Sequence, residues 1–168
     1  MVVLAKLLSG GGRRPTMAKL GADLSLSSSQ IHSSLRRLEK SRLISGKQEG
    51  GRPLLQPVEE FLIHGVKYAF PAQRGEITRG IPTAYAAPPL SAQIAAGSDP
   101  PPVWPAAEGK IRGTTLEPLH KMVPAAALKD PTLYELLALI DALRDGRTRE
   151  RQISERELKK RLQSLLHD

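Results

Sequence analysis

The spacing of hydrophobic residues predicts two short helices in the first third of the chain. The second runs from about Ser28 to Ser41 and buries a stripe at positions i, i+4 and i+7, made of Ile31, Leu35 and Leu38. The run Ser27-Ser28-Ser29-Gln30 matches a capping box and gives this helix a defined start. The first helix runs from a Thr16 cap to a tight turn at residues 25–26, and its apolar face is made of Met17, Leu20 and Leu24.

The flanking residues predict one helix before this pair and a β-hairpin after it. An apolar run over residues 2–8 predicts a helix that ends at the three glycines 10–12. Residues 43–44 begin an apolar strand, and residues 45–52 are Gly-rich and mostly basic. Such a hairpin is typical of a wing that lies along a DNA backbone or in the minor groove. A further helix is expected over residues 57–70, with Phe61, Leu62, Val66 and Phe70 facing the core.

The polar face of the second helix is built from residue types that contact DNA. Ser and Gln side chains hydrogen-bond base edges, and Arg reads guanine or binds phosphate. We expect contacts to base edges from Gln30, His32, Ser33 and Arg36. We expect contacts to phosphates or the minor groove from Ser28, Ser29, Arg37 and Lys40 and, in the hairpin, from Lys47 and Arg52. A basic helix face that is only solvated, or that binds a protein, is the alternative.

The run S-x-x-Q-I-H-x-x-L-R-R-L-E-K-x-x-L-I, which begins at Ser27, carries a family resemblance. Residues 1 to about 68 resemble the winged helix-turn-helix transcriptional regulators of bacteria and archaea, the MarR-like group in particular. The resemblance implies DNA binding by residues 28–40 and by the wing. One departure is Ser25, which stands in the turn where many such motifs have Gly.

The distribution of charge agrees with contact to phosphate. The chain carries a net charge of +8, and residues 1–56 hold 10 Lys and Arg against 3 Asp and Glu, a net charge of +7. Cations concentrated on one segment are the electrostatic footprint of nucleic-acid binding. A basic protein of the membrane surface would instead show Trp or Phe opposite the cations, and no such helix is found.

Residues 71–109 differ in composition from the rest and hold 8 of the 14 prolines. Proline disfavours helix, yet this segment keeps apolar residues and is not rich in charge or serine, as disordered linkers are. We expect an ordered, extended segment that packs over the first domain or over a dimer partner, with a flexible linker as the alternative. A weak strand pattern covers residues 110–116.

Two amphipathic helices are expected after Asp130, which caps the first of them, with Pro131 at its first position. The first ends at Gly146, and the second covers about residues 147–166. Because such helices need a partner surface, we expect them to form the two-fold interface of a homodimer; completion of a single-chain core is the alternative. A cluster of arginines at their junction alternates with acids and predicts a solvated face or, alternatively, an anion site: Arg144, Arg147, Arg149, Arg151 and Arg156.

No catalytic, cofactor or metal motif is present in the sequence, and the chain has no Cys. No apolar run is long enough for a convincing signal peptide or a membrane span, so we expect a cytoplasmic protein. The expected fold is mainly α with a β-hairpin wing in domain 1–70, a Pro-rich extended segment over 71–129, and a helical dimerisation region over 130–168. The expected function is a homodimeric, sequence-specific regulator of transcription that binds double-stranded DNA and represses by occlusion. The alternative is a protein-interaction module, such as an antitoxin-like protein that also binds its own operator.

Overall fold

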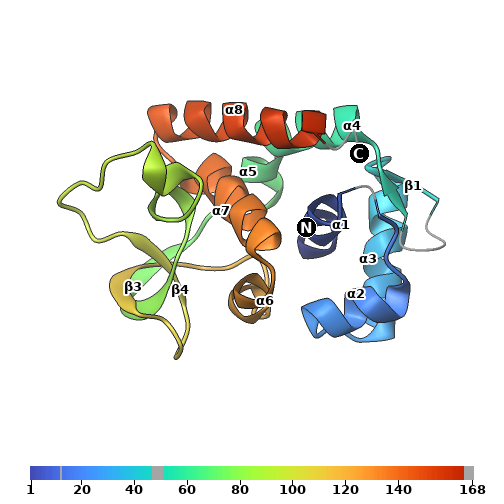
Figure 1. Ribbon diagram of the computed structural model, residues 1–168, viewed down its shortest axis with the longest axis horizontal. Coiled ribbons are helices and arrows are strands. Elements are labelled where there is room, and N and C mark those ends of the chain that lie inside the picture. The colour runs from blue at the N-terminus through green and yellow to red at the C-terminus, as the bar shows by residue number, and fades with distance from the viewer. Residues whose placement is uncertain (12, 47–50, 165–168) are drawn as a thin grey trace.

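The computed structural model describes residues 1–11, 13–46 and 51–164, and these form a mainly helical molecule with two small β-sheets (Figure 1). Three short helices open the chain, α1 (Val2–Ser9), α2 (Met17–Leu24) and α3 (Ser28–Lys40). The expected bounds of α2 and α3 are confirmed to within one residue. No helix in the described ranges is long and apolar enough to cross a membrane.

Local caps explain where α2 and α3 begin and end. The Thr16 hydroxyl accepts a hydrogen bond from the Lys19 N–H at 3.1 Å and starts α2. Ser25 ends α2 in the left-handed conformation, with φ of 52°, so a serine occupies the turn position that often holds glycine. The turn stays tight because Gly21 lets the Leu26 carbonyl approach, and a Cβ at Gly21 would lie 2.9 Å from that oxygen. Met17 is 42% exposed, so the buried stripe of α2 begins one turn later than expected.

A two-stranded antiparallel sheet follows α3, with β1 (Ile44–Ser45) paired to β2 (Arg52–Pro53). Gly51 has φ of 71°, and a Cβ there would lie 2.6 Å from the Ile44 Cδ1 atom, so this position requires glycine. The expected hairpin is present in its described part, and its residues 47–50, with the predicted contact residue Lys47, lie outside the described residues.

The helix expected over 57–70 starts two residues earlier and contains a π-turn. It consists of α4 (Leu55–Glu60), the π-helical η2 (Phe61–Gly65) and α5 (Val66–Ala69). Its buried stripe is Val58, Leu62 and Val66, which recur every four residues. Phe61 is only half-buried and Phe70 is 37% exposed, so the expectation that both face the core is wrong in part.

The Pro-rich segment and the residues after it fold into a three-stranded sheet; the sequence predicted one of its strands, over residues 110–116, but not the sheet. Strand β3 (Arg74–Pro82) pairs antiparallel with β4 (Pro102–Pro105) and with β5 (Ile111–Leu116), and β4 pairs parallel with β5. The three strands therefore close on themselves. Two 3-10 turns, η3 (Ala84–Ala86) and η4 (Leu90–Ala92), connect β3 to β4. The expected fold class had only a hairpin as β-structure. The prolines lie at strand ends, where they remove no central ladder bond, so the high proline content did not exclude a sheet here.

Helix α7 (Pro131–Asp145) lies at the centre of the molecule, between α6 (Val123–Lys129) and α8 (Thr148–Ser164) (Figure 1). Every residue from Leu136 to Leu143 is buried. α7 contacts α1, α5, α6, α8 and η3. Five of its buried apolar residues join a single core with those of α1 to α3, and two others belong to a second cluster next to the sheet region. The two helices expected to form a dimer interface therefore bury their apolar faces within the chain, because α1 and the sheet region cover α7.

A buried ion pair on α7 connects this helix to the three-stranded sheet and to the end of α5. The Asp141 carboxylate accepts hydrogen bonds from Thr83 Oγ1 and Trp104 Nε1, both at 2.7 Å, and pairs with Arg144 Nη1 at 2.6 Å. The Arg144 Nε donates to the Phe70 carbonyl at 2.6 Å. Burial raises the pKa of the Asp141 carboxyl, and Arg144 and the two neutral donors limit that rise. This pair thus holds the sheet and the end of α5 against one side of α7.

Candidate nucleic-acid interface

Helix α3 turns its polar residues toward solvent. Ile31, Leu35 and Leu38 are buried on one face. Every predicted contact residue of the helix is exposed: Ser28, Ser29, Gln30, His32, Ser33, Arg36, Arg37 and Lys40. In the hairpin, Arg52 is exposed on β2. The structure therefore gathers nine of the ten predicted residues on α3 and the neighbouring strand, and the tenth, Lys47, is outside the described residues.

Most of the exposed residues of α3 lie in two rows, and Ser28 and His32 lie on the other side of the first row. With about 3.6 residues per turn, positions 29, 33, 36 and 40 share one line along the helix, directly opposite the buried stripe. Positions 30, 34, 37 and 41 form a second line to one side. A molecule that approaches α3 from the solvent meets the first row. This row consists of Ser29, Ser33, Arg36 and Lys40.

The second row lines a groove between α3 and the helical run that follows the hairpin. Two adjoining cavities, of about 760 and 330 Å³, share Met1, Ser34, Arg37 and Phe70. Apolar groups contribute most of the wall of the larger one, among them Leu38, Leu43, Pro57 and Phe61. The Arg37 Nη2 donates to the Ser34 hydroxyl at 3.2 Å, which directs this guanidinium along the helix. Arg37 therefore lies at the edge of the solvent-facing row.

Gln30 has a structural task besides its predicted contact with a base. Its Oε1 accepts a hydrogen bond from the Ser27 N–H at 2.9 Å, and the Ser27 hydroxyl accepts one from the Gln30 N–H at 3.2 Å. This confirms the capping box at the start of α3. Because the acceptor oxygen of Gln30 is engaged in the cap, Gln30 is a weaker candidate for base contact than Arg36.

The cations around α3 have no carboxylate partner in the part of the chain that the structure describes. The ion pairs found there include none to Arg36, Arg37, Lys40 or Arg52. By contrast, three successive cations of α8 are paired with glutamates: Lys159, Lys160 and Arg161. Unpaired, exposed cations can neutralise phosphates without first breaking an ion pair.

One exposed cation beside this face was not among the contact residues predicted from the sequence. Arg42 directly follows α3, adopts a positive φ of 56° and is exposed. Its N–H donates to the Glu39 carbonyl at 2.9 Å, which turns the chain from α3 toward β1. The signal was available in the sequence, since Arg42 is the basic residue between the predicted helix and the predicted strand.

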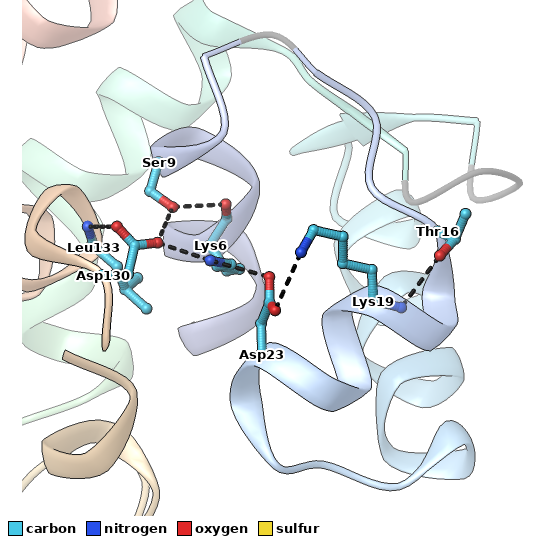
Figure 2. A network of polar contacts seen from close by, with 7 residues as sticks. All are labelled: Lys6, Ser9, Thr16, Lys19, Asp23, Asp130 and Leu133. Carbon is cyan, nitrogen blue, oxygen red and sulfur yellow. Dashed lines mark hydrogen bonds and ion pairs between the residues drawn. The ribbon is translucent and has the colours of Figure 1, made fainter. Parts of the chain in front are cut away.

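A polar network holds α2, and through it α3, against the rest of the molecule (Figure 2). The Lys6 ammonium of α1 lies 2.7 Å from Asp130 Oδ2 and 3.2 Å from Asp23 Oδ2. Asp23 belongs to α2, and Asp130 caps α7 by accepting the Leu133 N–H at 3.0 Å. One lysine thus connects three helices, and since α2 packs on α3, it helps to fix the orientation of α3.

The pKa values in this network follow from its hydrogen bonds. Burial alone would lower the pKa of Lys6, but hydrogen bonds to Asp130 and Asp23 outweigh burial and raise it. Burial alone would raise the pKa values of Asp23 and Asp130, but the bonds from Lys6 outweigh it and lower both. All three groups are therefore charged across the neutral pH range.

Comparisons with protein-family models, with curated proteins and with solved structures find no match to this chain. In the described ranges, no group of three or more His, Asp or Glu residues is placed to hold a metal ion. What the structure offers for a functional conclusion is the exposed face of α3, the cations around it and the adjoining hairpin.

Proposed function

We propose that the protein binds double-stranded DNA in a sequence-specific manner and regulates transcription, with α3 in the major groove. One observation carries the proposal. The row Ser29, Ser33, Arg36 and Lys40 is exposed along α3, opposite its buried stripe, and its two cations have no carboxylate partner in the described part of the chain. Hydroxyl and guanidinium groups in one row on a helix are suited to hydrogen bonds with base edges and phosphates.

The dimensions of α3 and its neighbours support the proposal. The 13 residues of α3 rise about 1.5 Å each, so the helix is about 20 Å long, and an α-helix diameter of about 10–12 Å suits a major groove roughly 12 Å wide. The order α2, turn, α3 and β1–β2 hairpin is the order expected of a winged helix-turn-helix, in which the second helix reads bases and the hairpin contacts the backbone, and it supports the proposal.

Within the proposed complex the residues of α3 have separate roles. Arg36, with Ser33 beside it and His32 on its other flank, contacts base edges. Lys40 at the end of α3 and Arg52 on β2 contact phosphates. Arg37, at the edge of the row, contacts phosphate from the groove side.

Repression and dimerisation remain predictions. The simplest form of repression is by covering promoter DNA. A homodimer would place two copies of α3 about 34 Å apart, one turn of DNA. The two amphipathic helices that suggested a dimer bury their apolar faces within the chain. The oligomeric state therefore has to be measured directly, for example by sedimentation equilibrium.

Selection of bound fragments from random duplex DNA tests the proposal. We expect an enriched motif with wild-type protein and loss of preference at one or two positions of that motif with Arg36→Ala. Arg156→Ala on α8, which changes an exposed arginine distant in sequence from α3, is the matched control and should select the wild-type motif. Recovery of random sequence by the wild-type protein would contradict sequence-specific binding.

A further inference from the structure

A third cavity lies in the part of the molecule that holds the three-stranded sheet. It has a volume of about 640 Å³ and is enclosed by β5, by the start of β3, by the segment that leads into β4 and by the first turn of α8. Four separate segments thus converge on one concave site of a size typical for small ligands. None of its lining residues belongs to α3 or the hairpin.

Three guanidinium groups line this cavity, those of Arg74, Arg147 and Arg149. Arg74 is held in place by Asp145, which accepts from its Nε at 2.9 Å and from its Nη2 at 2.7 Å, so the Nη1 group keeps its donors. In the described part of the chain no carboxylate pairs with Arg149. The arginines of the cluster predicted from the sequence therefore lie in different environments. Arg144 is buried with Asp141, while Arg147 and Arg149 face this cavity.

The two acidic residues of the cavity, Asp99 and Glu150, both contact Arg147. Glu150 Oε2 accepts the Arg147 N–H at 3.0 Å and caps the start of α8. Asp99 pairs with the Arg147 side chain at 3.1 Å, but these side chains are 69% and 79% exposed, and such a surface pair is weak. A bound anion with stronger charge can replace Asp99 as the partner of Arg147 at little cost.

Neutral donors and an apolar wall complete the cavity. Burial raises the pKa of the Tyr85 phenol, with help from Glu150 and Asp99, so this hydroxyl stays protonated and can donate a hydrogen bond. Thr114 and Thr115 add two further hydroxyls. Ile94, Pro100 and Pro102 supply apolar surface on the wall.

We propose that this cavity binds a small phosphate monoester whose organic part is about the size of a nucleoside. Arg149 and Arg147 bind the phosphate at the start of α8, and Arg74 directs its free Nη1 group to the same anion. Guanidinium groups match the oxygens of a phosphate bidentately, and the cavity is far larger than inorganic phosphate alone requires. The organic part lies between Tyr85 and the apolar wall. This site is independent of the proposed DNA contact.

Isothermal titration calorimetry of the full chain without DNA tests the site, with adenosine monophosphate, inorganic phosphate and adenosine as probes. We expect adenosine monophosphate to bind at least about tenfold more tightly than either of the other two, since only it carries both parts. Arg149→Gln should weaken its binding by about tenfold or more, the loss expected for a hydrogen bond to a charged group. Arg156→Gln, also exposed on α8 but outside this cavity, should bind as wild type does.

Several outcomes would overturn the proposal. Absence of heat with adenosine monophosphate at millimolar concentration would show that the cavity does not take such a ligand. Equal affinity of the wild type and of both Arg149→Gln and Arg147→Gln would place binding elsewhere. If adenosine bound as tightly as adenosine monophosphate, this would contradict the phosphate-binding role of the arginines. Arg149→Gln removes no ion pair within the described part of the chain, and unchanged Trp104 fluorescence confirms that the variant is folded.

Discussion

Some individual residues connect separate elements of this chain, and Asp141 is the clearest example, since it connects α7 to the three-stranded sheet. Its carboxylate takes donors from the sheet region, Thr83 and Trp104, and from Arg144, which in turn binds the carbonyl of Phe70. Because Asp141 is fully enclosed, Thr83 and Trp104 depend on its oxygens as acceptors, and Arg144 depends on its charge. Its loss would leave the Arg144 guanidinium, whose side chain is 5% exposed, without a counter-charge.

We predict that Asp141→Asn lowers the free energy of unfolding by about 3–5 kcal/mol, the usual cost of removing one partner of a buried ion pair. Urea unfolding followed by the fluorescence of the single tryptophan, Trp104, measures this change. Glu155→Gln, which breaks a half-exposed pair with Lys159, should cost less than about 1 kcal/mol. Equal costs for the two variants would contradict the role given to Asp141.

Arg37 provides a second prediction at this scale. Because it lies at the edge of the solvent-facing row and donates to Ser34, we expect it to contact phosphate and not a base. Arg37→Ala should therefore weaken binding to all duplexes by the same factor and reduce the slope of log affinity against log salt by about one. Fluorescence anisotropy over a salt series measures both quantities. A changed sequence preference would instead move Arg37 into the row that contacts bases.

Elements differ in how far the sequence predicts them. The bounds of α2 and α3 follow from local signals, the Thr16 cap and the capping box at Ser27, so they could be predicted. The three-stranded sheet could not, because its ladders join residues far apart, as in Arg74 with Leu116. Amphipathic spacing in α7 showed that one face is buried but not what covers it, which is why a dimer partner was expected where α1 packs.

The capping box makes a testable contribution to α3. Ser27→Ala removes the acceptor of the Gln30 N–H and should lower the free energy of unfolding by about 0.5–2 kcal/mol. Ser33→Ala changes an exposed serine of the same helix that lies on the solvent-facing row, and should change stability by less than about 0.5 kcal/mol. Thermal and urea unfolding of the two variants give the comparison. If the Ser27→Ala variant were as stable as the Ser33→Ala variant, the cap would not stabilise the protein as predicted.

In the molecule as a whole, the Lys6 network connects the proposed DNA-binding helices to α7. Asp23 and Asp130 have pKa values below the ordinary value of 3.8, so their stabilisation is complete above that pH and is lost as the pH falls through their folded-state pKa values. The pKa of Lys6 lies above 10.5, so its contribution is lost only as the pH rises through that raised value. The two carboxylates therefore contribute to the acid side of the stability curve, together with Glu157, whose pKa is also lowered.

We predict that Lys6→Met makes the acid loss of stability shallower, because the pKa values of Asp23 and Asp130 return toward their ordinary value. The free energy of unfolding measured at several pH values between about 4 and 2 tests this. Lys19→Met is the matched control, since the Lys19 side chain is 66% exposed and its ion pair with Asp23 is long, at 3.4 Å. It should leave most of the acid slope in place. Identical slopes for wild type and Lys6→Met would contradict the pKa shifts assigned to this network.

The affinity of the protein for the selected duplex, relative to a shuffled duplex of the same composition, tests the central claim most directly. If α3 reads base edges, wild-type protein should bind the selected duplex about 10³-fold or more tightly at physiological salt. Arg36→Ala should reduce that preference by about 1–3 kcal/mol. Equal affinity of the wild-type protein for both duplexes would contradict sequence recognition by α3.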